Sequence, residues 1–299
     1  MACIEGKWFR EENDLWAGYS QSYQIEEVLH HAKSKYQEIL VFKSKSFGNV
    51  LVLDGIVQCS ERDEFAYQEM IAHLPLNCHP NPKKVLVVGG GDGGVVREVL
   101  KHDVQSVVLC EIDEQVVEVS KKYLPEMSKC FGDPRLKVFI GDGVQFMKQN
   151  KGEFDVIITD APDPIGVAKG LFETDYYNSM KIALAPGGIV CSQGESFYFD
   201  LEFIQQFVTM ARIAFPRVGF AYTVMPSYTG GHIGFVMCST SPDVVFEEPV
   251  RHYTDEEISQ MGLLYYNTAI HRAAFVLPQF VKKALEPAPG TANGQTTDT

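Results

Sequence analysis

The sequence predicts an α/β protein in which a small N-terminal all-β domain precedes a Rossmann-like, methyltransferase-type doubly wound sheet. Between residues 20 and 60, short β-branched and aromatic runs are separated by turn signals, a pattern typical of a small β-domain. From residue 84 onward, apolar runs alternate with helical stretches. That alternation indicates a parallel sheet covered by helices on both faces.

The first part of the chain contains three expected strands, at 36–43, 50–53 and 56–59. Asp54 and Gly55 separate the last two apolar runs, and an Asp-Gly pair in that position is a hairpin signal. The segment 62–76 has apolar residues near helical spacing and is followed by a linker rich in Pro and Asn. We therefore expect residues 1–77 to form a β-strand domain with a linking helix.

The second part contains five expected strands ahead of or between helical stretches, at 84–88, 106–113, 136–142, 154–160 and 187–193. Two further β-rich runs, 218–226 and 232–239, are too close together for a helical crossover. We expect them to pair antiparallel at one edge of the sheet. Residues 78–286 should form the Rossmann-like catalytic domain, and the polar tail 287–299 should be disordered.

The composition excludes several classes of protein. The 299-residue chain has a net charge of −13, which argues against nucleic acid as a partner. No apolar run approaches the roughly 20 residues that a membrane-spanning helix needs, and the N-terminus lacks a secretory signal. Its seven cysteines contain no CxxC pair, so we read them as reduced structural residues. A cytoplasmic protein with no membrane partner is expected.

Acidic residues follow four of the expected strands, and they are Asp92, Glu111, Asp142, Asp160 and Asp163. Ligands of doubly wound sheets bind outside the carboxyl ends of the strands, so these side chains should meet at one rim. Any one of them taken alone is equally a turn or helix-cap residue. Clustered carboxylates also suit a metal, but no His or Cys supplements the set, and we expect no metal.

The glycine-rich loop 89–94 (GGGDGG) follows a strand and precedes a helix, with Glu111 about 20 positions further on. This pattern fits dinucleotide-binding and methyltransferase-like enzymes equally. Asp92 separates them, because a carboxylate in this loop would repel a pyrophosphate but attract a cosubstrate with a positive sulfonium. Glu111 is then available for two ribose hydroxyls, and the Asp142-Gly143 pair for an adenine amino group.

Residues 5–285 resemble the spermidine synthases of the polyamine aminopropyltransferase family. The segments that carry the resemblance include GKWFRE (6–11), VGGGDGG (88–94), TDAPDP (159–164) and HRAAFVLP (271–278). In that family, decarboxylated S-adenosylmethionine donates its aminopropyl group to the diamine putrescine, giving spermidine and methylthioadenosine. The resemblance implies an enzyme with this cosubstrate, with no other cofactor, and with a homodimeric or homotetrameric assembly.

The resemblance also implies roles for individual residues. Asp160 matches the catalytic aspartate, which takes a proton from the acceptor because an amine with a pKa near 10 arrives as an ammonium. The implied donor-binding residues are Gln37, Gln68, Gly89, Gly91, Asp92, Glu111, Asp142 and Gly143. The implied acceptor-binding residues are Trp16, Tyr67, Asp160, Asp163, Gln193 and Tyr228.

The chain departs from the family's usual sequence in segments that border the acceptor pocket, namely 17–23, 161–167, 196–200 and 227–231. The sequence therefore does not decide whether the acceptor is putrescine, cadaverine or spermidine. A putrescine N-methyltransferase is an alternative, against which Asp92 argues because those enzymes carry an apolar residue there. A further alternative is an inactive relative that binds polyamine or serves as a scaffold.

Overall fold

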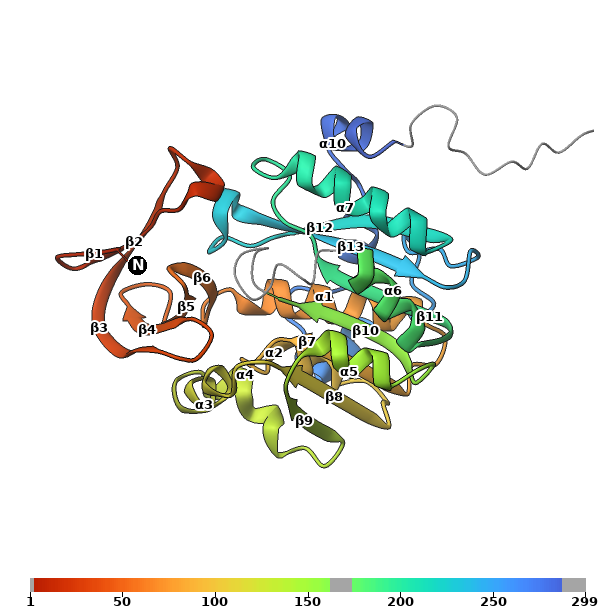
Figure 1. Cartoon of the computed structure of the whole chain (residues 1–299), viewed down its shortest axis with the longest axis horizontal. Coiled ribbons are helices and arrows are strands. Elements are labelled where there is room, and N and C mark those ends of the chain that lie inside the picture. The colour runs from red at the N-terminus through yellow and green to blue at the C-terminus, as the bar shows by residue number, and fades with distance from the viewer. Residues whose placement is uncertain (1–2, 162–173, 287–299) are drawn as a thin grey trace, which may run out of the picture.

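The computed structural model describes residues 3–161 and 174–286, which form two sheets and their covering helices (Figure 1). A six-stranded N-terminal sheet precedes a seven-stranded mixed sheet. Asp163 and the tail 287–299, for which the sequence makes predictions, lie outside the described residues. This two-part α/β architecture is the predicted fold class.

The N-terminal sheet is an antiparallel meander of β1 (Cys3–Glu5), β2 (Trp8–Glu11), β3 (Gln21–Lys33), β4 (Glu38–Ser44), β5 (Asn49–Leu53) and β6 (Ile56–Ser60). The last three are the predicted strands. Asp54 and Gly55 have φ values of 47° and 86°, as the predicted tight hairpin requires. The sequence does not predict β3, because its pairing is interrupted by two register shifts and much of the strand is exposed.

The larger sheet consists of β7 (Lys84–Gly89), β8 (Ser106–Glu111), β9 (Leu136–Ile140), β10 (Phe154–Asp160), β11 (Leu184–Gln193), β12 (Arg217–Val224) and β13 (His232–Ser239). Their spatial order is β12-β13-β11-β10-β7-β8-β9, with β7 to β11 parallel. β12 and β13 pair antiparallel at one edge, as predicted. The order reverses between β7 and β10, and a ligand is expected at that point.

The helices are α1 (Glu64–Cys78), α2 (Gly94–Val99), α3 (Glu114–Tyr123), α4 (Pro125–Ser128), α5 (Gly143–Gln149), α6 (Thr174–Ala183), α7 (Leu201–Ala214), α8 (Asp255–Met261), α9 (Thr268–Ala273) and α10 (Gln279–Ala284). Both faces of the sheet are covered, one by α1 and α2 and the other by α5 to α7. Alternate residues of β7 face opposite ways. Val85 and Val87 pack with α1 and α2, whereas Leu86 and Val88 pack with α5 to α7. No helix of the described ranges is long and apolar enough to cross a membrane.

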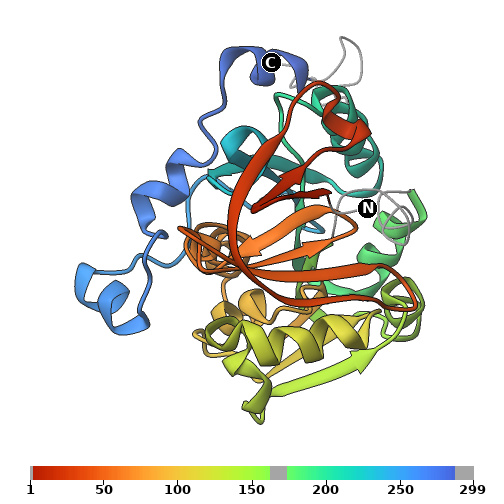
Figure 2. The same cartoon turned by 90° about the vertical axis from the view of Figure 1, so that its left-hand side faces the viewer.

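The N-terminal sheet packs against the larger sheet's helices. Ile39 and Leu51 form one apolar cluster with Val116 of α3 and Met127 of α4. Figure 2 shows the N-terminal strands in front of the larger sheet. This packing places β4 to β6 over the rim where the parallel strands end.

A buried carboxylate ties α1 to the C-terminal part of the chain. Glu69, with 1% of its surface exposed, accepts hydrogen bonds from the backbone N–H groups of Leu264, Tyr265 and Tyr266 at 2.8, 2.9 and 2.7 Å. An ionised carboxylate has enough lone pairs for three such donors, whereas a neutral amide offers one acceptor oxygen. Glu69 therefore fixes the loop that leads to α9.

We predict that Glu69→Gln lowers the free energy of unfolding by about 2–3 kcal/mol, because at least one buried N–H loses its acceptor. Urea denaturation measures the change. Glu256→Gln is the matched control: Glu256 is exposed on α8 and its side chain accepts one bond from Gln260. A loss in Glu69→Gln no larger than in Glu256→Gln would contradict this interpretation.

Candidate active site

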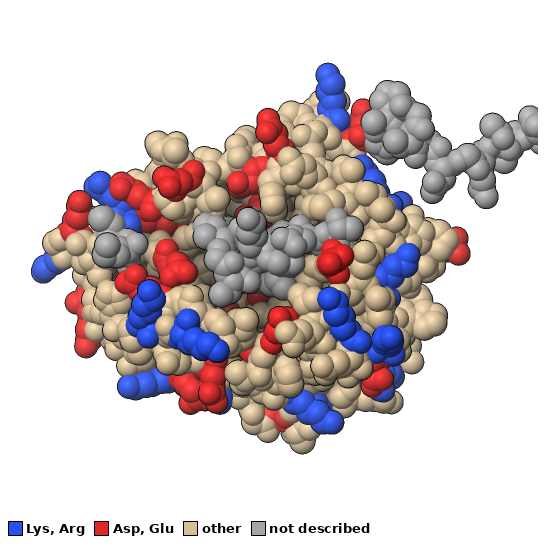
Figure 3. Space-filling view, viewed as in Figure 1, with Lys and Arg blue, Asp and Glu red and all other residues tan. Residues whose placement is uncertain are grey.

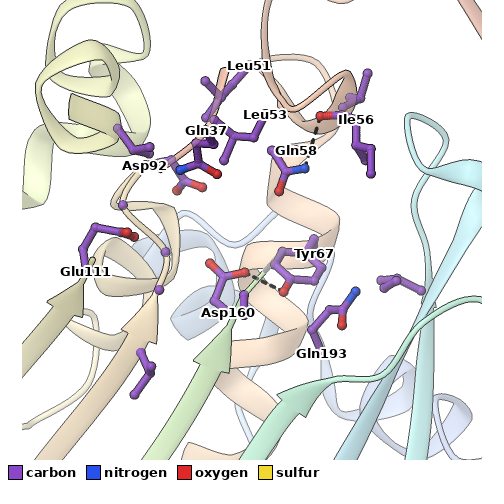
Figure 4. A pocket seen from close by; sticks show the side chains of 18 of the residues that line it. Gln37, Leu51, Leu53, Ile56, Gln58, Tyr67, Asp92, Glu111, Asp160 and Gln193 are labelled. Carbon is purple, nitrogen blue, oxygen red and sulfur yellow. Dashed lines mark hydrogen bonds between the residues drawn. The ribbon is translucent and has the colours of Figure 1, made fainter. Parts of the chain in front are cut away.

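A cavity of about 240 Å³ lies over the carboxyl ends of β7, β8 and β10, where the strand order reverses (Figure 4). The N-terminal sheet contributes to its wall through Leu51, Leu53 and Gln58. Every site residue predicted from the sequence within the described ranges lines it, and these are Trp16, Gln37, Tyr67, Gln68, Gly89, Gly91, Asp92, Glu111, Asp142, Gly143, Asp160, Gln193 and Tyr228. Their individual roles stay predictions.

The glycines of the loop are required by the two neighbouring acids. A Cβ on Gly89 would lie 2.0 Å from the Asp160 carbonyl oxygen, and one on Gly90 would lie 2.8 Å from Asp160 Oδ2. Both residues have positive φ, at 78° and 68°. A Cβ on Gly91 would lie 2.9 Å from Glu111 Oε2. The loop can pass between the carboxylates only because it has no side chains there.

Asp92 is held within this loop. Its Oδ1 accepts the backbone N–H of Gly94 at 2.6 Å, and Gln68 Nε2 of α1 donates to the same oxygen at 3.3 Å. Burial raises the pKa of Asp92. A buried carboxylate with so few donors is suited to a cationic ligand that restores its ionised form.

Glu111 ends β8 and is buried beside the loop. Its Oε1 accepts the backbone N–H of Asp113 at 2.9 Å. Burial, together with the negative charge of Asp113, raises the pKa of Glu111 to about 7. Gln37, from the N-terminal domain, donates through Nε2 to Asp113 Oδ2 at 3.0 Å.

Asp160 ends β10 and stands in the middle of the cavity, between Glu111 on one side and Gln193 on the other (Figure 4). The hydroxyl of Tyr67 donates to its Oδ1 at 2.7 Å. Desolvation and then the negative charge of Asp92 raise the pKa of Asp160 to about 7, and the bond from Tyr67 opposes the rise. A carboxyl group with this pKa can hold or release a proton at neutral pH.

Aromatic rings and unpaired polar atoms line the other half of the cavity. The rings of Tyr67 and Tyr228 meet edge to face at 5.6 Å, and Tyr228 donates to the carbonyl oxygen of Gln58 at 2.7 Å. Trp16 Nε1 and Gln193 Oε1 are buried and have no hydrogen-bond partner within the described residues. Such atoms are suited to contact a bound ligand.

Asp142 differs from the other acids. Its side chain is exposed, and its Oδ1 caps α5 by accepting the N–H groups of Val144 and Gln145 at 2.7 and 3.1 Å. A Cβ on Gly143 would lie 2.6 Å from Val88 Cγ1, so this strand end passes close to β7. For Asp142 the helix-cap reading of the sequence holds in addition to its place on the rim.

Two buried acids in the cavity wall were not predicted. Glu11, from β2, is 1% exposed and accepts from Thr229 Oγ1 at 3.0 Å and from the backbone N–H of Val57 at 2.9 Å. Glu195 follows β11 with a φ of 59° and is also buried. The strand-end rule, applied to β11 as it was to the earlier strands, would have found Glu195. The strand-end rule does not reach Glu11, because its partners are far away along the chain, although Glu11 is the last residue of the family-like segment 6–11.

The site has the chemistry of a cation-binding pocket. Figure 3 shows that both acidic and basic side chains are spread over this face, so the acids that matter here are those that line the cavity. Across residues 3–161 and 174–286, no group of three or more His, Cys, Asp or Glu side chains is arranged to hold a metal ion. Asp92, Glu111 and Asp160 line the cavity as separate carboxylates, and their negative charges suit a cationic ligand.

Comparison with known proteins connects this site to one family. A spermine/spermidine synthase domain model matches residues 64–248, and a spermidine synthase tetramerisation domain model matches residues 7–61. Spermidine synthase of Dictyostelium discoideum is 58% identical over 95% of this chain and 99% of its own length. The Schizosaccharomyces pombe spermidine synthase is 49% identical over 95% and 96%.

Solved structures are similar over nearly the whole chain as well. A spermidine synthase in complex with the transition-state analogue AdoDATO has a TM-score of 0.86 at 36% identity, covering 93% of this chain and 94% of that one. Spermidine synthase from Thermotoga maritima has a TM-score of 0.85 at 36% identity, covering 94% and 95%.

We predict that Asp160→Asn stabilises the ligand-free protein by about 1–3 kcal/mol above pH 7 and leaves it unchanged near pH 4. The folded pKa of about 7 lies above the ordinary value of 3.8, so the folded wild type binds more protons than the unfolded chain between these values. Its stability therefore falls as pH rises through this window, and the neutral amide removes that fall.

Thermal denaturation of both proteins from pH 4 to pH 8 measures the difference. The exposed Asp243 provides the control variant Asp243→Asn. A constant difference between Asp160→Asn and wild type across the whole range would contradict the assigned direction.

Proposed function

The chain belongs to the spermine/spermidine synthase family, and we propose that its cavity transfers the aminopropyl group of decarboxylated S-adenosylmethionine to putrescine, giving spermidine and methylthioadenosine. One observation carries the proposal. Asp160, a carboxylate with a pKa raised to about 7, stands between a half of the cavity lined by carboxylates and a half lined by tyrosines. That placement suits proton removal from an amine at the point where two ligands meet.

The donor occupies the side of Glu111 and Asp92. Glu111 accepts hydrogen bonds from the ribose hydroxyls, while Asp142 and Gly143 border the adenine. Asp92 attracts the terminal ammonium of the decarboxylated donor. Ordinary S-adenosylmethionine would bring its own carboxylate towards Asp92 and be repelled. The related structure with AdoDATO supports a ligand of this class.

The acceptor amine reaches the site as an ammonium and has no free lone pair until it loses a proton. Asp160 takes that proton, while the Tyr67 hydroxyl keeps the carboxylate aimed. The freed lone pair attacks the carbon next to sulfur, and the electrons of the carbon–sulfur bond move to the positive sulfur. The leaving group is a neutral thioether, so no general acid is needed.

The distal ammonium of the acceptor lies at the far end of the tyrosine side. Trp16, Gln193 and Tyr228 form this part of the wall. Asp163, which lies outside the described residues, is proposed as a further acceptor-binding residue. Glu11 and Glu195 add negative charge there. Two carboxylates at this end favour a diamine, whose second nitrogen is also charged.

The match of residues 7–61 to a tetramerisation domain model supports a homo-oligomer, and we propose a homodimer or homotetramer. The division of the chain into 1–77 and 78–286 and a cytoplasmic location, as expected from the sequence, belong to the same proposal.

We predict that the purified protein converts putrescine and decarboxylated S-adenosylmethionine to spermidine, with lower rates on cadaverine and on spermidine. Asp160→Asn should reduce kcat/KM by about 10²–10⁴, because the amide accepts the Tyr67 bond but cannot take a proton. Chromatography of the polyamines measures both. In the wild type, kcat/KM should rise as pH increases through about 7.

Asp243→Asn again serves as the control, and it should retain wild-type rates. Activity of Asp160→Asn within threefold of wild type would rule out Asp160 as the general base. No aminopropyl transfer to any diamine by the wild type would rule out the proposed reaction itself.

We predict that Asp92→Asn weakens binding of decarboxylated S-adenosylmethionine by roughly tenfold or more, because the amide keeps the Gly94 contact but loses the charge. Discrimination against ordinary S-adenosylmethionine should fall. Calorimetric titration with each compound measures the ratio. Glu118→Gln, on the exposed face of α3, is the control. An unchanged ratio, or methyl transfer exceeding aminopropyl transfer in the wild type, would contradict this role.

A further inference from the structure

A further buried acid, Asp113, lies beside Glu111 on the donor side of the cavity. It is 2% exposed and does not line the cavity among the described residues, whereas Glu111 and Gln37 do. Its backbone N–H donates to Glu111 Oε1 at 2.9 Å. Its Oδ1 accepts the N–H of Gln115 at 3.1 Å and so caps α3.

The second carboxylate oxygen of Asp113, Oδ2, accepts hydrogen bonds from the N-terminal domain. Asp113 Oδ2 accepts from Ser34 Oγ at 2.6 Å and from Gln37 Nε2 at 3.0 Å, both in the turn between β3 and β4. Ser34 Oγ in turn accepts the N–H groups of Tyr36 and Gln37, each at 3.0 Å. Because the lone pairs of Ser34 Oγ accept these two hydrogen bonds, its hydroxyl hydrogen is donated to Asp113. The turn formed by residues 34–37 is therefore held in place by hydrogen bonds to Asp113 Oδ2.

Helix capping alone does not account for an aspartate here. Asn caps a helix about as well as Asp and carries no charge. A buried carboxylate beside the buried Glu111 is unfavourable, and its charge contributes to the raised pKa of Glu111. The negative charge interacts favourably with the N-terminus of α3, and it also strengthens the hydrogen bonds from the two donors that approach from the other domain.

We propose that Asp113 is a positioning residue that sets the spacing between Glu111 and Gln37, and thereby couples the docking of the 34–37 turn to binding of the donor's ribose. The inference rests on the proposed role of Glu111 as the ribose-binding acid. Asp113 holds one wall residue by its N–H and the other by its carboxylate. Loss of the Asp113 carboxylate therefore releases Gln37 and the 34–37 turn while the N–H bond to Glu111 remains, and it alters donor binding without any contact to the reacting atoms.

The test is calorimetric titration of the full-length protein with 5′-methylthioadenosine, which carries the ribose and adenine but no aminopropyl group. Asp113→Asn should raise the dissociation constant roughly 10- to 100-fold, because its amide points a donor at the donors of Ser34 and Gln37. Ser34→Ala removes one partner and should raise it roughly three- to tenfold. The KM for decarboxylated S-adenosylmethionine should rise in parallel, with the KM for putrescine unchanged.

Asp155→Asn is the matched control, because Asp155 Oδ2 also accepts two backbone N–H groups, from Lys83 and Lys84, but at the opposite end of β10. It should bind 5′-methylthioadenosine within twofold of wild type. Equal increases in the KM of donor and acceptor, or an affinity of Asp113→Asn within twofold of wild type, would overturn the inference.

Two outcomes separate this inference from the proposal on which it rests. If Glu111→Gln binds 5′-methylthioadenosine as tightly as wild type, the role of Glu111 fails, and the role of Asp113 fails with it. If Glu111→Gln loses affinity while Asp113→Asn keeps it, only the positioning role is wrong. Should Asp113→Asn show no cooperative thermal transition, Ser34→Ala decides by the same criterion.

Discussion

The structure depends on a set of carboxylates that line one cavity at the edge of a parallel sheet. Parallel strands end on the same side, so the acids that follow them must converge. Two of these acids, Glu111 and Asp160, have pKa values raised to about 7, and burial is the leading cause for both. Glycines at 89, 90 and 91 let the backbone pass between them where any side chain would collide. Without a bound ligand, the clustered carboxylates raise the free energy of the folded protein. A bound cation lowers that free energy.

The N-terminal sheet completes the site. Gln37, Trp16 and Glu11 reach the cavity from it. The 225–231 segment after β12 is held from the same side, because Tyr23 and Gln21 donate to the carbonyl oxygen of Ser227, each at 2.9 Å. The parallel sheet alone would supply the donor-side acids but would lack much of the cavity's wall. The docking of the two sheets is therefore part of the binding geometry.

The sequence predicts features that local patterns encode. The strands β7, β8 and β10 are nearly continuous apolar runs whose side chains pack on both faces of the sheet, whereas the equally apolar β9 is a largely exposed edge strand. The acids at the strand ends follow from that assignment. It does not predict β1 to β3, whose mixed polar and apolar residues lack a clear period. Nor does it predict Glu11 or Asp113, whose roles depend on Thr229 and Gln37, 218 and 76 positions away. Such contacts become visible only when the two sheets are docked.

The two halves of the cavity differ in how well their walls tolerate substitutions. On the donor side, Asp92 and Glu111 are buried and each accepts a backbone N–H, and Gly91 beside them has no room for a side chain. Substitutions at these positions collide or leave a buried group unpaired. On the acceptor side, Trp16 and Gln193 keep polar atoms without a partner in the described part of the chain, and the wall is made of ring contacts. Ring packing tolerates changes of shape better than a buried charge tolerates the loss of its donor. The wall built from ring contacts can therefore change shape at a lower free-energy cost than the wall built from buried carboxylates.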